Sequence, residues 1–257
     1  MNDRSKFIQE AISDFTRPWS QRRGIESLDC NVVATFVRTP LNKLSDVLAE
    51  KAIVAKRDVV GLEIELSNNY VFAFQLVGHD WSIILDEANT SPLMPTTAEL
   101  SQQLGQSIDL MISDCISAIS YDLYENGEVI ESFGGEEGEP EGWLDGWSSG
   151  EGYQGYVLSP YPEDPKFKQV AYFMSRRRQV AAAEIGNIWD FAERFMCEAD
   201  VYEPAIDLDY LLGDDSSECH RYKVQNPGLT LILDLTTEEK ITSVPDLVRV
   251  DYFDFGT

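Results

Sequence analysis

The serine of a short glycine-flanked stretch is the first residue that could act as a nucleophile. Residues 146–150 read Gly-Trp-Ser-Ser-Gly, which matches the pattern G-x-S-x-G with Ser148 at its centre, and His220 follows downstream. In α/β-hydrolases this serine follows a buried strand and precedes a helix. Here both flanks are rich in glycine and acidic residues, and such short patterns recur by chance. We therefore assign no catalytic residue to this stretch.

Two further groups of residues have the chemistry of metal ligands without the spacing of a known site. Asp207, Asp209 and Glu218 are spaced like part of a calcium-binding loop, but leucines stand where that loop needs an oxygen ligand and a glycine. Cys219 and His220 are adjacent, and no further pair follows at zinc-site spacing. The sequence therefore predicts neither a metal site nor a cofactor.

Carboxylates are the most abundant groups that could do acid–base chemistry. The chain has 45 Asp and Glu but only two histidines, His79 and His220. Two carboxylates held close together can serve as general acid and base, or hold a metal ion for hydrolysis. Which carboxylates lie together depends on the fold. A carboxylate-based or metal-assisted hydrolase is therefore the enzymatic hypothesis.

Negative charge is concentrated in the middle of the chain. The formal net charge is -25, and residues 58–165 contain 21 acidic residues and no lysine or arginine. The first 57 residues carry 10 basic and 7 acidic residues, and residues 166–257 carry 10 and 17. Such a field repels nucleic acid and anionic lipid and attracts basic proteins. We expect no nucleic-acid or membrane partner.

The densest acidic stretch is the segment 134–165, which we call the acidic segment. It holds eight glycines and eight acidic residues together with tryptophans and tyrosines that a plain linker does not need. Aromatic residues can anchor a partner while acids steer it. We expect partner-binding residues here and in the hairpin before it, namely Glu136, Glu137, Glu139, Glu141, Trp143, Asp145, Trp147, Asp122 and Glu131.

These features favour an acidic protein-interaction module that binds a basic partner protein. Nuclease inhibitors, immunity proteins that neutralise toxins, and DNA mimics present acidic faces of this kind, although no motif links the chain to any of them. The hydrolase is the first alternative. The second is a structural or housekeeping domain whose acidic surface serves solubility alone.

Cysteine use and hydropathy indicate the compartment. The four cysteines form no C-x-x-C pair, and the first residues show no apolar signal region. No apolar run approaches the length of a membrane span. We expect reduced thiols and a cytoplasmic location.

The elements that must position these residues follow from hydrophobic periodicity. Alternating or continuous apolar runs predict strands, and apolar residues at helical spacing predict helices. We expect an α+β fold with a mainly antiparallel sheet, a few helices packed on one face, and a long acidic loop. Residues 1–257 form either one domain or two tightly packed halves, about 1–133 and 166–257, joined by that loop. The predicted strands span 30–38, 59–66, 70–77, 81–87, 116–124, 128–133, 169–175, 229–235 and 247–255, with one short strand at 156–159 inside the acidic loop. The predicted helices span 6–15, 41–51, 97–104 and 181–197.

The clearest local signal is a hairpin around Asn126-Gly127, a pair of residues that favours a two-residue type I′ turn. Acidic residues face each other twice in the resulting register, which is unfavourable unless a cation or partner relieves it. The arginines at 176–178 are the expected partners within the chain. The predicted cross-strand pairs are Glu125–Glu128, Tyr124–Val129, Leu123–Ile130 and Asp122–Glu131.

Overall fold

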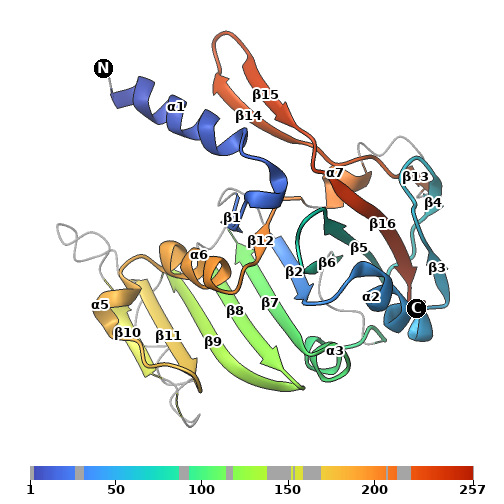
Figure 1. Cartoon of the computed structure of the whole chain (residues 1–257), viewed down its shortest axis with the longest axis horizontal. Coiled ribbons are helices and arrows are strands. Elements are labelled where there is room, and N and C mark those ends of the chain that lie inside the picture. The colour runs from blue at the N-terminus through green and yellow to red at the C-terminus, as the bar shows by residue number, and fades with distance from the viewer. Residues whose placement is uncertain are drawn as a thin grey trace.

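The fold is built on one ten-stranded sheet whose neighbouring strands all pair antiparallel. The computed structural model describes residues 3–26, 32–86, 93–113, 118–137, 152, 154–158, 169–206, 208–212 and 221–256. The strand order is β10-β11-β9-β8-β7-β2-β6-β5-β16-β3 (Figure 1). The expected α+β class with a mainly antiparallel sheet is confirmed.

Strands from both parts of the chain enter this sheet, because β11 and β16 lie beyond residue 165. The ten strands are β2 (Val32–Val37), β3 (Val54–Lys56), β5 (Tyr70–Leu76), β6 (Ser82–Asp86), β7 (Gln106–Ser113), β8 (Ala118–Glu125), β9 (Glu128–Glu137), β10 (Gln154–Leu158), β11 (Gln169–Ser175) and β16 (Leu247–Asp254). Three two-stranded sheets accompany it: β1 (Gly24–Ile25) with β12 (Tyr202–Glu203), β4 (Glu63–Glu65) with β13 (Arg221–Lys223), and β14 (Leu229–Asp234) with β15 (Glu239–Ser243).

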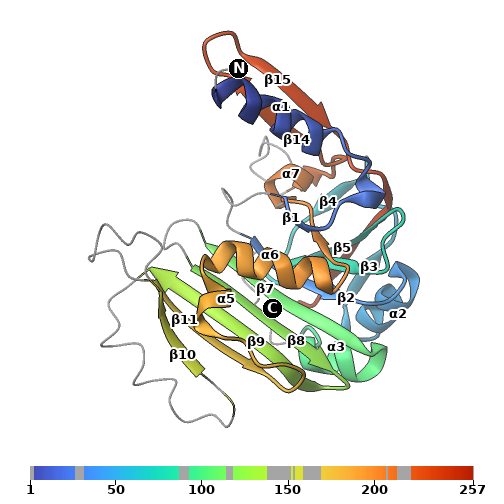
Figure 2. The ribbon, with the colours of Figure 1, turned by 60° about the vertical axis from the view of Figure 1, so that its left-hand side comes forward.

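The described helices lie before and between these strands in the sequence. They are α1 (Asp3–Phe15), the 3-10 turn η1 (Trp19–Gln21), α2 (Leu41–Lys51), α3 (Thr97–Leu104), α5 (Ala182–Ile185), α6 (Ile188–Glu198) and α7 (Leu208–Leu212). In both views α1 and the β14–β15 hairpin project from the same end of the molecule (Figures 1 and 2).

Helices cover both faces of the large sheet, which corrects the expectation that they pack on one. Along β5, Phe72 and Phe74 point to the face covered by α6, whereas Val71 and Ala73 point to the face covered by α2 and α3. Alternation of side chains along a strand explains this division. Because β5 is buried over its whole length, both of its faces need a covering layer.

The hairpin between β8 and β9 forms at the predicted turn, but its register changes after two pairs. Asn126 and Gly127 have φ of 52° and 88°, as a type I′ turn requires. The predicted pairs Glu125–Glu128 and Tyr124–Val129 are confirmed. A bulge then inserts one residue on β9. As a result Leu123 faces Glu131 and Asp122 faces Ser132, so the two remaining predicted pairs are wrong.

The predicted helix 181–197 is two helices. Gly186 separates α5 from α6 with a φ of 46°, a backbone conformation that a helix does not contain. The Asn187 side chain then accepts a hydrogen bond from the Trp189 amide and caps α6. The periodic apolar stripe is therefore continuous in sequence although the helix is not.

Candidate functional site

The arginines after β11 meet the hairpin of β8 and β9. The Arg176 guanidinium lies 2.6 Å from the Glu128 carboxylate, and Arg177 lies 3.1 Å from that of Glu125. A hydrogen bond from Gln106, and then that from Arg177, lowers the pKa of Glu125. The expected pairing of the arginines with the acidic hairpin is confirmed. Both pairs are solvent-exposed, so each contributes little to stability.

Arg178 makes the strongest of these contacts because its partner is buried. Its Nε and Nη2 lie 3.0 and 3.1 Å from the two carboxylate oxygens of Glu131, which is 3% exposed. Nη1 donates to Glu198 on α6, and the guanidinium lies 3.7 Å from the centre of the Phe195 ring. Burial alone would lower the pKa of Arg178, but the hydrogen bonds to Glu131 and Glu198 raise it. Ser175 Oγ also donates to Glu131, at 3.0 Å.

Asp122 lies on the opposite face of the sheet from Glu131. Ser132 donates a hydrogen bond to its carboxylate, and burial raises its pKa. Across the neighbouring strand pair, Asp122 stands directly opposite Asp109, which in turn stands opposite Thr35 on β2. This row brings together two carboxylates of the kind that acid–base chemistry uses. The sequence alone did not reveal the pair because it depends on the register of β7 and β8.

The remaining predicted binding residues begin at the end of β9. Glu136 is half-buried, and this burial raises its pKa. Glu137 pairs with Gln169 through the β9–β11 ladder. Five predicted residues lie outside the described part of the chain: Glu139, Glu141, Trp143, Asp145 and Trp147. The structure thus shows that Asp122 and Glu131 do not share one surface, because the bulge sets them on opposite faces.

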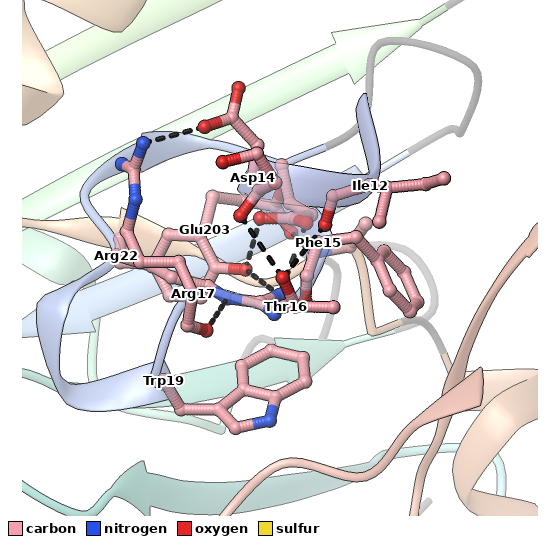
Figure 3. A network of polar contacts seen from close by, with 12 residues as sticks. Ile12, Asp14, Phe15, Thr16, Arg17, Trp19, Arg22 and Glu203 are labelled. Carbon is pink, nitrogen blue, oxygen red and sulfur yellow. Dashed lines mark hydrogen bonds and ion pairs between the residues drawn. The ribbon is translucent and has the colours of Figure 1, made fainter. Parts of the chain in front are cut away.

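A second polar network, which the sequence gave no reason to expect, surrounds Arg22 (Figure 3). Arg22 is 3% exposed and donates to the carbonyl oxygens of Phe15 and, at 2.9 Å, Arg17. It also lies 3.1 Å from Glu26 and 3.9 Å from the centre of the Trp19 ring. The guanidinium therefore caps the C-terminal end of α1 and ties it to the body of the protein.

His79 continues this network from the turn between β5 and β6. Its Nε2 lies 2.8 Å from the Trp19 carbonyl oxygen, and its ring stacks on Tyr202 at 5.8 Å. Burial lowers the pKa of His79. Burial also raises the pKa of Tyr202, whose hydroxyl donates to Glu26 at 2.5 Å. The network contains titratable groups, and its contacts join the end of α1 and η1 to the β5–β6 turn, Glu26 and β12.

The described residues contain no group of three His, Cys, Asp or Glu side chains arranged to hold a metal ion. Within that same part of the chain, no helix combines the length and the apolar character needed to cross a membrane.

No protein-family model, no curated protein and no solved structure matches this chain. We therefore infer its function from charge, burial and register alone.

Proposed function

We propose that this protein binds a basic protein partner through the acidic segment 134–165. The observation that carries the proposal is the engagement of the nearest arginines. Arg176, Arg177 and Arg178 are all bound to Glu128, Glu125 and Glu131 of the hairpin or to Glu198. Each of these arginines forms its ion pairs with carboxylates that lie outside the acidic segment.

The charge of the acidic segment therefore exceeds what its neighbours in sequence can neutralise. It contains eight acidic residues, and the next basic residues along the chain before the arginines are Lys166 and Lys168. A concentration of one sign of charge raises the association rate with an oppositely charged partner. The partner is expected to be a protein rather than a nucleic acid, because phosphates would be repelled.

Aromatic side chains supply the second half of the proposed contact. Trp143 and Trp147 lie among the acids of this segment, and tryptophan is enriched among the residues that dominate binding energy. In this proposal the tryptophans determine how slowly the complex dissociates. The carboxylates of Glu139, Glu141 and Asp145 determine how fast it forms and how strongly it responds to salt.

The test is retention of partner proteins from the host lysate by the immobilised full chain at low and at high salt. One variant replaces Glu136, Glu139, Glu141 and Asp145 by their amides. A matched control makes the same charge change at four exposed acids elsewhere, namely Glu63, Asp80, Glu238 and Glu239.

We expect basic proteins to be retained by the wild type and the control at low salt, and released at high salt. The variant of the acidic segment should retain much less. Equal retention by the two amide variants would contradict the proposal, as would retention of no basic protein by the wild type.

A carboxylate-based hydrolase is a second candidate, favoured by the direct opposition of Asp109 and Asp122 in the β7–β8 register. The raised pKa of Asp122 suits a general acid. Screening chromogenic ester, phosphate and glycoside substrates against the wild type, Asp109→Asn and Asp122→Asn tests it. Hydrolysis that both substitutions abolish would support this candidate, and hydrolysis that persists in both would contradict it.

A further inference from the structure

Strand β10 forms one end of the ten-stranded sheet (Figure 1). It pairs with β11 through an uninterrupted five-residue register, from Gln154 opposite Phe173 to Leu158 opposite Gln169. Among the described residues, no strand pairs with its other side. The outward amides and carbonyls of such an edge are a template on which another strand can pair.

The two ends of the sheet differ in how they are protected. At the far end, β3 has three residues, among them the exposed Lys56, and Arg57 follows it. Short length and basic side chains are features that discourage pairing at an edge. By contrast β10 reads Gln-Gly-Tyr-Val-Leu, with no charge and no proline, and its Val157 is 51% exposed. The β10 edge lacks these features.

The β10 edge is also held in place by the rest of the fold. Leu158 is buried in the core on the α6 face, and Tyr156 packs against the same core. The Tyr156 hydroxyl lies 2.7 Å from the carbonyl oxygen of Val180, just before α5. A strand that is already fixed loses little conformational entropy when a partner pairs with it.

The charge around β10 indicates what kind of strand would pair there. The strand lies inside the acidic segment, preceded by Glu151 and followed by Glu163 and Asp164 in the sequence. Two strands away, Glu136 stands at the end of β9 opposite Val170, which is itself opposite Val157. A strand carrying lysine or arginine would meet complementary charge, whereas an acidic strand, including a second copy of β10 with its own acidic flanks, would be repelled.

We propose that an extended, lysine- or arginine-bearing segment of the partner protein pairs with the β10 edge that no described strand occupies, and so extends the sheet by one strand. Backbone hydrogen bonds along β10 provide affinity, and Glu136, which shares a cross-strand row with Val157, favours basic residues in the added strand. This proposal rests on the proposed function and specifies how that partner docks.

Alternating Lys-Val peptides test the pairing, with fluorescence anisotropy of a labelled peptide as the measurement. One peptide is unmodified, and two carry N-methyl groups on alternate residues, each in one of the two possible phases. Methylation removes backbone donors from one edge of the peptide without changing its charge. We expect the unmodified peptide to bind the full chain at low salt, and at least one methylated phase to bind about tenfold more weakly or worse.

Two matched substitutions locate the binding edge. Val157→Lys adds a charge to β10, and Ile232→Lys adds the same charge to β14, where Ile232 is 58% exposed. We expect V157K to bind the peptide at least about tenfold more weakly than the wild type. The affinity of I232K should stay within about twofold of the wild type.

Each other outcome overturns a defined part of the account. If all three peptides bind equally, or the two lysine variants behave alike, the pairing with β10 is wrong while binding of a basic partner still stands. If no peptide binds even at low salt, but a basic protein is retained from lysate, the pairing is again wrong. If neither peptide nor basic protein binds, the proposed function fails with it.

Discussion

At the scale of single residues, Arg178 is the side chain on which the hairpin contact most depends. It neutralises the buried Glu131, whereas Arg176 pairs with a carboxylate in solvent. Removing one partner of a buried ion pair leaves an uncompensated charge and costs about 3–5 kcal/mol. We therefore expect Arg178→Ala to lower the free energy of unfolding by about that amount. Arg176→Ala should lower it by less than about 1 kcal/mol.

Urea denaturation measures both losses. The double variant Glu131→Gln with Arg178→Ala should recover part of the loss, because a neutral amide is less costly to bury than a lone carboxylate. Equal losses in the two single arginine variants would mean that burial of Glu131 does not govern the pair.

His79 gives the protein a predictable response to pH. Burial lowers its pKa below the ordinary 6.5. Between the folded and the ordinary pKa the unfolded chain binds more protons, so the free energy of unfolding falls as the pH drops through that window. One such group contributes a slope of at most about 1.4 kcal/mol per pH unit.

Urea denaturation of the wild type and His79→Gln at pH 7.5 and pH 5.5 isolates this contribution. His220 is present in both proteins, so any contribution from it is common to the two measurements. We expect the wild type to lose more stability than the variant on acidification, and parallel losses would show that His79 is not the responsive group.

The sequence predicts the ion pairs between the arginines 176–178 and the hairpin, but it does not predict the network around Arg22. The pairing of arginines 176–178 with the hairpin could be predicted because the like charges of the hairpin require a cation, and three consecutive arginines can supply it. The Arg22 network involves Tyr202, which is 180 positions away in the sequence. It also involves backbone carbonyl oxygens, whose positions no side-chain pattern predicts.

At the scale of elements, the Tyr172 side chain of β11 lies over Gly134 of β9, the residue with which it pairs. A Cβ added at Gly134 would lie 1.9 Å from the Tyr172 hydroxyl oxygen and 2.2 Å from the ring carbon that bears it. Such overpacking typically costs about 1–3 kcal/mol. We expect Gly134→Ala to destabilise the protein by that amount, measured by urea denaturation.

The Tyr172→Ala background provides the control. With the ring removed, the same Gly134→Ala change should cost clearly less, since the clash is with that side chain. An unchanged cost in the two backgrounds would place the effect in the backbone of β9 instead.

Element prediction succeeded where a local signal decides the structure. The Asn126-Gly127 turn determined the first pairs of the hairpin. The helix predicted over 97–104 is α3, and the structure shows a capping box of Thr96 and Glu99 at its start. The bulge on β9 could not be predicted from the local sequence. It places Glu131 against Arg178, which is more than forty residues away along the chain. The break at Gly186 escaped because apolar periodicity runs through it.

At the scale of the whole molecule, the sequence predicts the fold class but not the order of the strands in the sheet. Short strands and interspersed helices indicated α+β. The order of the ten strands, in which β2 lies between β6 and β7 and β16 lies between β5 and β3, depends on contacts between segments far apart in sequence. The opposition of Asp109 and Asp122 follows from that order, as does the exposure of β10 at one end.

The most direct test of the central claim is the salt dependence of association. The claim is that the acidic segment 134–165 holds negative charge that the chain leaves for a partner. Stopped-flow measurements give the association rate constant of the unmodified Lys-Val peptide across a series of salt concentrations. The proteins compared are the wild type, the amide variant of Glu136, Glu139, Glu141 and Asp145, and the matched control at Glu63, Asp80, Glu238 and Glu239.

We predict a rate that falls steeply with salt for the wild type and the matched control, and a clearly shallower dependence for the acidic-segment variant. The same steepness in all three proteins would contradict the account, because the attraction would then come from charge spread over the whole surface.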